Sequence, residues 1–360
     1  MSKAVYKRLG NFIREVNVRN RELKVTKLVG LTIDKTFIPS VANVIGTDLS
    51  TYKIIRKEQF ACSLMQVSRD GKMPIAMFTE DEAIMSPAYP IFEIINKNVL
   101  LPQYLMMWLT RSEFDREASY YAVGGVRGSL TWEDFCNLRL PVPTIERQHE
   151  IVTEYETLSN RIRLNEQMIK KLEETAQALY RKMFVDNIDK ENLPDGWRMG
   201  TLGEIANVSS GNTCFNKMNK KEPPYIYPIA GASSIIGYSS SFNSEEQVLT
   251  TGRVGTLGVI NKYRGKTYMA DNVLVIKSHY YEFCYQLLQL LDYNEIAKGG
   301  VQSLITQTDL KAVEILIPNT GVLTEYENTV SPLFEMIEIK QQENENNTEL
   351  QSLLLAKMGQ

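Results

Sequence analysis

The stretch from Pro141 to Asp186 constrains the fold of this chain more than any other. It opens with Pro-Val-Pro-Thr-Ile-Glu, and no glycine or proline follows between Thr144 and Asp186. Proline is excluded from helix interiors and threonine can cap the first free N–H groups, so we expect a helix to begin near Pro143 and Thr144. Apolar residues then recur in alternating steps of four and three, the heptad pattern of a long helix packed against another helix. This seam consists of Ile151, Tyr155, Leu158, Ile162, Ile169, Leu172, Ala176, Leu179 and Met183, with the polar Asn165 in one slot.

Such a helix would be about 60 Å long, which is too long to be buried in one small domain. We therefore predict a rod that separates two globular bodies. A second helical segment, Val322–Lys357, ends the chain with a poorer seam, in which Lys340, Asn344 and Asn347 take apolar positions. The simplest closed arrangement packs the two helices antiparallel, with one body at each end. The polar seam residues could fix the register of the pair, but we favour contact with solvent or with a polar partner.

The two halves of the chain resemble each other in order, which predicts an internal repeat. Leu9-Gly10-Asn11-Phe12-Ile13 resembles Leu202-Gly203-Glu204-Ile205, and Gly124-Gly125-Val126-Arg127 matches Gly299-Gly300-Val301-Gln302. Asp134 through Leu140-Pro141-Val142-Pro143 matches Asp309 through Leu316-Ile317-Pro318. The predicted order is therefore body, helix, body, helix.

The sequence of each body predicts a mixture of short strands, turns and one helix. In the first body we expect strands at Lys24–Ile33, Gln59–Val67, Ile75–Phe78 and Tyr89–Ile95, and a helix at Pro102–Ser119. In the second we expect strands at Gln247–Thr251, Gly258–Asn261 and Asn272–Lys277, and a helix at Phe283–Asp292.

Charge is distributed unevenly along the chain. The net charge is −3, but residues 322–360 hold 2 Lys and Arg against 7 Asp and Glu, whereas residues 1–144 hold 19 against 15. The acidic charge thus belongs to the helical segments, and the bodies are neutral or mildly basic. This distribution permits contact with DNA without requiring it.

The remaining composition indicates a cytosolic protein without a metal centre. Cys62, Cys136, Cys214 and Cys284 lack CxxC spacing, and with only two histidines a zinc site is not expected. Reduced, buried thiols suit the cytosol. The N-terminus lacks the apolar core of a secretory signal, and no apolar run is long enough to span a membrane.

We find no set of residues that predicts catalysis by this chain. No GxxxxGK[ST] loop is present. Glu222-Pro223-Pro224-Tyr225 is close to the Asn/Asp-Pro-Pro-Tyr/Phe motif of amino-methyltransferases, but no glycine-rich cofactor loop precedes it. A proline-containing lead into a strand is the simpler interpretation.

Paired turns carry the clearest binding signal. Arg69-Asp70-Gly71-Lys72 in the first body corresponds to Arg253-Val254-Gly255-Thr256 in the second, each between two expected strands. An arginine on a tight loop can form two hydrogen bonds to guanine or grip a phosphate, although each alone could equally be a surface turn residue. The predicted DNA-contacting residues are Lys35, Ser68, Arg69, Lys72, Tyr89 and Arg127, and then Ser233, Ser234, Tyr238, Thr251, Arg253, Thr256 and Gln302.

The whole pattern resembles the specificity (S) subunits of type I restriction–modification systems. Leu-Pro-Val-Pro-Thr-Ile-Glu-Arg-Gln at 140–148 and Leu-Pro-Asp-Gly-Trp at 193–197 carry the resemblance. Further matches are Ser86-Pro87-Ala88-Tyr89, Leu202-Gly203-Glu204-Ile205, Pro228-Ile229-Ala230-Gly231 and Gly252-Arg253-Val254-Gly255. Each motif is short, but in order and repeated they are specific. The second helix departs from the pattern because Ile-Pro-Asn-Thr-Gly at 317–321 lacks the Pro-x-Pro-x-x-Glu-x-Gln form.

The resemblance implies an α+β fold with two target recognition domains, residues 1–143 and 192–320, joined by long antiparallel helices at 144–191 and 321–360. Each domain would read one half of a bipartite, asymmetric DNA target. The chain itself would bind no cofactor and no metal. It would position two methyltransferase subunits that carry S-adenosylmethionine and methylate adenine N6, with ATP- and magnesium-dependent restriction subunits in the restriction complex. The residues assigned to methyltransferase docking are Ile151, Tyr155, Leu158, Ile162, Ile169, Leu172, Leu179, Leu333 and Ile337.

Two other classes of protein remain open on the residues alone. A two-domain coiled-coil scaffold without a DNA role would explain the helices but not the paired arginine turns. A self-sufficient DNA methyltransferase is opposed by the missing cofactor loop.

Overall fold

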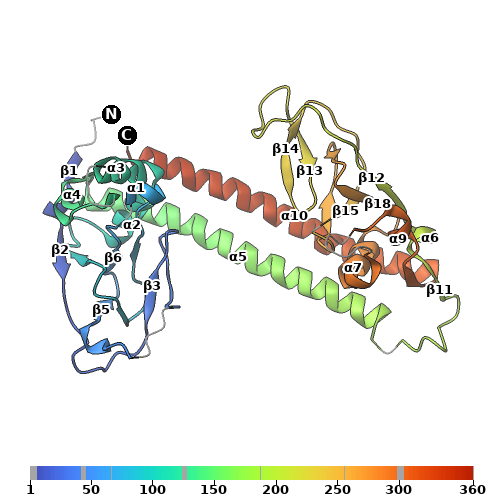
Figure 1. Cartoon of the computed structure of the whole chain (residues 1–360), viewed down its shortest axis with the longest axis horizontal. Coiled ribbons are helices and arrows are strands. Elements are labelled where there is room, and N and C mark those ends of the chain that lie inside the picture. The colour runs from blue at the N-terminus through green and yellow to red at the C-terminus, as the bar shows by residue number, and fades with distance from the viewer. Residues whose placement is uncertain are drawn as a thin grey trace. The chain divides into compact units, whose positions relative to one another are not determined.

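The two long helices are shared between two units of the structure. The structure is a computed structural model that describes residues 6–41, 46–65, 67–123, 128–186, 188–254, 256–297 and 304–359. Unit 1 is Met1–Leu164 with Gln342–Gln360, and unit 2 is Asn165–Gln341. Helices α5 (Ile145–Phe184) and α10 (Thr320–Lys357) therefore each contribute to both units (Figure 1). None of the described helices has both the length and the apolar character needed to cross a membrane.

Helix α5 begins and ends close to its predicted bounds. The Thr144 Oγ1 accepts a hydrogen bond from the backbone N–H of Arg147 at 3.4 Å, so threonine caps the first turn as expected. In unit 1 the Gln351 side chain donates to Ser159 Oγ at 2.6 Å, and Arg161 pairs with Glu343. Residue numbers rise along α5 as they fall along α10, which confirms the antiparallel packing in this unit.

The same packing holds in unit 2 through aromatic side chains. The ring centroid of Tyr326 on α10 lies 6.0 Å from that of Tyr180 and 5.1 Å from that of Phe184, both on α5. Val330 and Phe334, further along α10, share one buried cluster with Ala176 of α5. Both ends of the helix pair are thus part of a globular core, because aromatic and aliphatic burial dominates the free energy of such contacts.

The polar seam residues were expected to contact solvent or a polar partner, and for Asn165 the first of these alternatives is wrong. Asn165 does not face solvent, because its exposed fraction is 3%. It occupies a seam slot of α5, and the helical period places that slot on the buried side whatever residue it holds.

Unit 1 is built around a four-stranded antiparallel sheet with strand order β2-β9-β6-β7. Two-stranded pairs β1–β10, β3–β4 and β5–β8 surround it. The elements are β1 (Tyr6–Arg8), η1 (Leu9–Asn11), β2 (Ile13–Val16), β3 (Val29–Leu31), β4 (Phe37–Pro39), η2 (Leu49–Thr51), β5 (Lys53–Arg56), β6 (Phe60–Cys62), α1 (Val67–Asp70), β7 (Ile75–Met77), β8 (Glu82–Met85), β9 (Ile91–Ile94), α2 (Pro102–Thr110), α3 (Ser112–Ala122), α4 (Trp132–Asn137) and β10 (Arg139–Pro141).

Unit 2 repeats this plan with the antiparallel sheet β12-β18-β15-β16 and adds a three-stranded sheet β14-β13-β17. Its pair β11–β19 corresponds to β1–β10 of unit 1. The elements are β11 (Arg198–Thr201), α6 (Leu202–Ile205), β12 (Asn207–Ser210), β13 (Tyr227–Ala230), β14 (Ile235–Ser239), β15 (Val248–Gly252), β16 (Asn261–Tyr263), β17 (Tyr268–Met269), β18 (Val273–Lys277), α7 (Tyr281–Leu290), α8 (Tyr293–Ile296), α9 (Gln307–Lys311) and β19 (Glu314–Ile317).

Matching backbone contacts confirm the predicted repeat. The N–H of Leu9 donates to the carbonyl of Leu138 at 2.8 Å, and the N–H of Leu202 donates to that of Val313 at 3.0 Å. Helices α4 and α9 both begin with a reciprocal capping box, formed by Thr131 with Asp134 and by Thr306 with Asp309. The repeated residues are therefore structural. The leucine backbone joins the beginning of each body to its end, and the aspartate caps the helix that precedes the last strand of the body.

Several element bounds differ from the predicted ones. The single helix expected at Pro102–Ser119 is broken at Arg111, whose guanidinium carbon lies 4.2 Å from the centroid of the Trp108 ring. The turn expected at Arg69 is helix α1, closed by Gly71 with a φ of 66°. The strand expected at Lys24–Ile33 is only β3, and the one expected at Gly258–Asn261 begins at Asn261 as β16. Tertiary contacts decide these bounds, and local propensity is a weak guide to them.

A buried ionic network joins β16, α7 and α10 in unit 2. Lys262 pairs with Glu282, whose side chain is 1% exposed, and Arg264 Nη2 lies 3.3 Å from the same carboxylate. Arg264 Nε also lies 3.0 Å from the Glu338 carboxylate of α10. The Lys262 ammonium lies 3.2 Å from the centroid of the Phe334 ring. Burial lowers the pKa of Lys262 to about 8 and raises the pKa of Glu282. For each residue, therefore, burial disfavours the charged form.

Unit 1 has a neutral pair at the equivalent positions. Lys262 pairs in register with Leu249 of β15, as Met77 does with Phe60 of β6. Glu282 is the second residue of α7, as Gln103 is the second residue of α2. The same fold therefore accepts either a charged or a neutral pair here.

We expect Glu282→Gln to destabilise the chain by roughly 3 kcal/mol, because it leaves the Lys262 ammonium buried without its main carboxylate. The double variant Lys262→Met/Glu282→Gln copies the pair of unit 1 and should recover most of that loss. Urea denaturation of the full chain measures both. A double variant no more stable than the single one would contradict this account.

Candidate nucleic-acid interface

Strand topology gathers three loops at one end of each main sheet. Strands β12 and β15 are both antiparallel to β18, so their carboxyl ends lie where β18 begins. We call the loops at this end (residues 211–218, 253–254 and 270–272) the loop edge of unit 2. In unit 1, β2 and β6 relate to β9 in the same way, and the loop edge comprises residues 17–25, 63–73 and 86–90, apart from residue 66.

Arg253 occupies the loop edge of unit 2, as predicted. Its N–H donates to the carbonyl of Asn272 at 3.1 Å, and its Nη1 lies 3.4 Å from the carbonyl of Asp271. The carboxylate of Asp271 in turn accepts from Thr213 Oγ1 at 2.7 Å. The Arg253 Nε is buried without a hydrogen-bond partner in the described structure. These contacts hold the guanidinium at the loop edge with unused donor capacity.

The hairpin between β13 and β14 adjoins this arginine. The N–H of Gly231 donates to the carbonyl of Ser234 at 2.9 Å, which closes the turn and leaves Ser233 and Ser234 exposed. A Cβ atom on Gly252 would lie 3.0 Å from the Cβ of Ala232 and 2.5 Å from Thr256 Oγ1. The structure thus brings the predicted residues Ser233, Ser234, Arg253 and Thr256 together.

The strand-like segment after residue 303 also reaches Arg253. Val254 forms an antiparallel bridge with Leu304, and the N–H of Ile305 donates to the carbonyl of Arg253 at 3.1 Å. The predicted residue Gln302, with its Gly299-Gly300 turn, lies outside the described residues.

In unit 1, α1 places Ser68 and Arg69 at the loop edge. Gly128 has a φ of 69°, and a Cβ there would lie 2.0 Å from Ser68 Oγ, so this glycine permits close approach to α1. Arg69 is exposed and pairs with Asp70 at 2.7 Å, and Lys72 lies 3.6 Å from Asp34. The predicted residue Arg127 lies outside the described part of the chain.

Tyr89 belongs to this edge through its position before β9. Its side chain is half-buried, and its carbonyl accepts from Lys53 Nζ at 2.9 Å. Tyr238 is also half-buried and lies in β14, where its N–H and carbonyl both pair with Met218.

Two predicted contact residues are buried instead. Lys35 is 9% exposed, and its ammonium lies 2.8 Å from the Asp115 carboxylate and 5.3 Å from the centroid of the Phe114 ring. Burial lowers the pKa of Lys35, while Asp115 opposes that shift. Thr251 lies in β15 and is fully buried, because both faces of this central strand are covered. Neither side chain can reach a ligand without breaking its surroundings.

The residues predicted to dock partners mostly serve the cores of this chain itself. Ile151 and Ile337 are buried, and Tyr155, Ile169, Leu172, Leu179 and Leu333 pack partly buried against the two main cores. Leu158 and Ile162 are half-buried. The assignment of Ile151 and Ile337 to a partner surface is therefore wrong, because a heptad seam packs first against the helix of its own chain. The exposed apolar residues of α5 and α10 are Leu164, Met168, Met336, Ile339, Leu350 and Leu353.

Sequence reasoning missed the residues between β12 and β13. Lys217, Lys220 and Lys221 are exposed there, and Thr213 reaches Asp271 at the loop edge. The closely spaced lysines were the available signal. The link between Thr213 and Arg253 through Asp271 depends on strand order, which the local sequence does not state.

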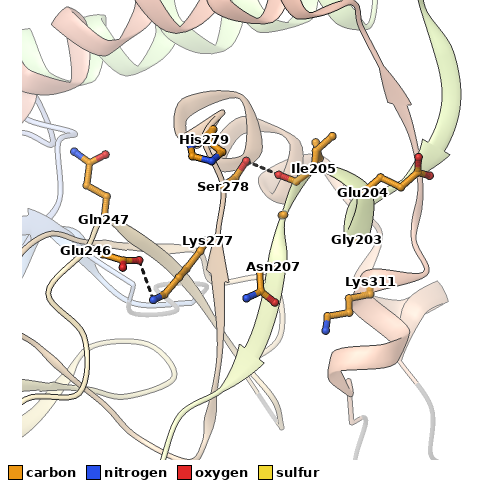
Figure 2. A pocket seen from close by; sticks show the side chains of 11 residues that line it. Gly203, Glu204, Ile205, Asn207, Glu246, Gln247, Lys277, Ser278, His279 and Lys311 are labelled. Carbon is orange, nitrogen blue, oxygen red and sulfur yellow. Dashed lines mark hydrogen bonds and ion pairs between the residues drawn. The ribbon is translucent and has the colours of Figure 1, made fainter.

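A polar cavity of about 650 Å³ lies at the opposite end of the unit 2 sheet, where Asn207 pairs with Lys277. Figure 2 shows Lys277 paired with Glu246, at 2.9 Å, and the Ser278 hydroxyl donating to the carbonyl of Ile205. Since Lys277 is already neutralised and the cavity lies away from the loop edge, we do not include it in the candidate interface. The described residues contain no group of three or more His, Cys, Asp or Glu that could hold a metal ion.

Comparison with known proteins gives consistent matches. The chain is 24% identical over 174 residues to the EcoprrI specificity subunit of a type I restriction enzyme from Escherichia coli, covering 45% of this chain and 43% of that one. It is 22% identical to the MjaIX specificity subunit from Methanocaldococcus jannaschii, covering 65% and 62%. The HindI specificity subunit from Haemophilus influenzae is 20% identical, covering 77% and 81%. The chain thus spans less than two thirds of the length of the first two relatives.

A solved structure supports the fold. The S subunit of a type I restriction-modification system from M. genitalium superposes with a TM-score of 0.67 at 13% identity, covering 99% of this chain and 97% of that one. The family model described as the type I restriction modification DNA specificity domain matches residues 66–174 and 194–348, which is more than half of the chain. The protein therefore belongs to the type I restriction-modification DNA specificity family.

Proposed function

We propose that this chain is the DNA-reading specificity subunit of a type I restriction–modification complex, and that each unit reads one half of a bipartite target. The observation that carries the proposal is the repeated loop edge. In both units the same sheet end presents an arginine, Arg69 or Arg253, with different neighbours around it. Both arginines lie in the loop that follows the corresponding sheet strand, Arg69 in α1 after β6 and Arg253 directly after β15, and different side chains at this end are what two unlike half-sites require.

The chemistry of the two edges suits DNA. Arginine can bind guanine O6 and N7 with two hydrogen bonds, and the exposed Ser233 and Ser234 can serve either bases or phosphates. Lys72 and the lysines at 217, 220 and 221 supply charge for the phosphate backbone. Arg127 and Gln302 stay predicted contacts.

In this proposal the chain is not catalytic and holds no cofactor. Two methyltransferase subunits would bind it, carry S-adenosylmethionine and methylate adenine N6, and restriction subunits using ATP and magnesium would join them for cleavage. Their docking surface would be the exposed apolar side chains of α5 and α10, because exposed apolar residues gathered on helices favour protein partners. The complex would act in the cytoplasm.

We expect Arg253→Ala to weaken binding to the cognate duplex by roughly 10- to 100-fold, the loss of one bidentate base contact. Gel-shift titration of the complex with its methyltransferase subunits measures this. Arg198→Ala is the matched control, since Arg198 is an exposed arginine of unit 2 paired with Glu204 away from the loop edge. Unchanged affinity of the Arg253 variant would remove that residue from the reading surface.

We expect the two helices to set the gap between the half-sites. Inserting four residues after Leu164 in α5 and four after Gln341 in α10 adds about 6 Å to each helix. The methylated motif should keep both half-sites and gain one or two unread base pairs between them, because each base pair adds about 3.4 Å. Long-read detection of methylated adenines in a host carrying the variant reads the gap directly. The original gap would contradict the proposed spacing role.

We expect Ile339→Glu to reduce methyltransferase binding at least about 10-fold, because a charge would replace an apolar side chain that is 57% exposed. The melting temperature should stay the same, since the fold does not bury this residue. Thr329→Glu, also exposed on α10, is the control. Analytical ultracentrifugation of mixed subunits measures assembly, and equal assembly of both variants would place the docking surface elsewhere.

A further inference from the structure

The loop after β12 is held rigidly at both ends. The N–H of Asn212 donates to the carbonyl of Met269 at 3.0 Å. At the other end Met218 and Tyr238 exchange two backbone hydrogen bonds of 2.9 and 2.8 Å. The loop therefore leaves the four-stranded sheet at β12 and is joined to the three-stranded sheet at β17 and β14.

Side chains inside the loop fix its course as well. Thr213 donates through its hydroxyl to Asp271, and its carbonyl accepts from the Tyr268 hydroxyl at 3.0 Å. The Cys214 thiol lies 3.5 Å from the carbonyl of Asn216. The tip between these contacts cannot fold back onto the domain without breaking them.

This tip presents Phe215 to solvent. The residue is 89% exposed, although burying a phenylalanine side chain is worth about 2 kcal/mol. Met218, which is 44% exposed, ends the same loop, and Lys217, two residues after Phe215, is exposed. The fold gains nothing from this aromatic ring, so its placement points to a ligand.

The loop is tied to the reading residues already described. Asp271 accepts from Thr213 through its carboxylate and from Arg253 through its carbonyl. Phe215 and Arg253 therefore lie on two loops that share one anchoring residue at the same sheet end. Lys220 and Lys221 follow in the same connection and are exposed. Exposed lysines in the same connection as Phe215 favour a nucleic-acid ligand over an apolar protein surface.

Unit 1 has a similar loop with an exposed apolar residue after β2, the first strand of its main sheet in sequence. Leu23 is 55% exposed and has a φ of 53°, a backbone conformation that is rare for leucine. Its N–H donates to the carbonyl of Asn20 at 2.9 Å, and the Asn20 side chain exchanges two hydrogen bonds with the backbone of Val25. Glu22 and Lys24 flank it and pair with each other, and Arg21 precedes them and is exposed.

We propose that Phe215 inserts into the base stack of the half-site bound by unit 2, and that Leu23 does the same in unit 1. The inference rests on the proposed function and names the DNA contact of these two loops. Phenylalanine and leucine are among the apolar wedges that proteins insert between base steps, and neighbouring cations hold the adjacent phosphates. A loop held by hydrogen bonds on both sides of Phe215 suits this role because less backbone freedom is lost on binding.

The test uses the full chain in complex with its methyltransferase subunits. The DNA duplexes contain the target sequence, which is the motif found methylated in the host. In each duplex, 2-aminopurine replaces one base of the half-site of unit 2. The wild type should give increased fluorescence at one step, because insertion unstacks the probe. Phe215→Ala should lose that increase and bind about 10-fold more weakly, which corresponds to about 1.4 kcal/mol. Its melting temperature should not change, because the ring is exposed.

Two further variants sharpen the experiment. Phe215→Leu places in unit 2 the side chain that unit 1 uses, and should keep the fluorescence increase with affinity within about threefold of the wild type. Leu290→Ala trims an exposed apolar residue at the end of α7 and should change neither quantity. Leu23→Ala should affect only probes in the other half-site.

The outcomes separate this inference from the proposed function. Tight wild-type binding without increased fluorescence at any position, or the same profile in Phe215→Ala, would overturn insertion and leave the specificity function standing. Weaker binding of Phe215→Ala with an unchanged profile would also overturn it, since the ring would then touch DNA without entering the stack. If the wild-type complex binds the target sequence no more tightly than an unrelated duplex, both the insertion and the specificity function are overturned.

Discussion

The packing of α5 against α10 is the contact on which the rest of the structure depends. In unit 1 the end of α10 shares a core with Ile151 and Val152 of α5, and in unit 2 the start of α10 surrounds Tyr180 and Phe184. Each main sheet thus packs within a core that includes both helices. Burial of this shared apolar area stabilises the domains and the helix pair together, because side chains of both belong to the same buried clusters.

On this common frame the two units use different chemistry at matching positions. Met77 and Gln103 in unit 1 stand where Lys262 and Glu282 form a buried ion pair in unit 2. A buried pair need not add stability, but it penalises any arrangement that leaves one charge alone. The loops vary more freely, since they contact solvent and leave the sheet register unchanged. The proposed reading of two different half-sites by one fold requires this kind of variation.

Much of the architecture could be predicted because it rests on patterns that repeat. The seam of α5 and the paired Leu-Gly and Asp residues gave the helix and the internal repeat, since periodicity and capping act over short distances. The positions of Arg253, Ser233 and Ser234 in turns were also predicted, because arginine, glycine and small polar residues are typical of turns. Lys35 and Thr251 were misjudged because nothing local shows that Asp115 or the neighbouring strands cover them.

The amino-acid sequence by itself determined the two helices, the tandem plan and the family to which the chain belongs, since all three depend on residue spacing along the chain. Only the tertiary structure decided which side of each helix is free. The seam residues pack in the protein's own cores, and residues such as Ile339 stay exposed. It alone decided that Phe215 and Arg253 share one sheet end, because strand order joins loops that lie far apart in sequence.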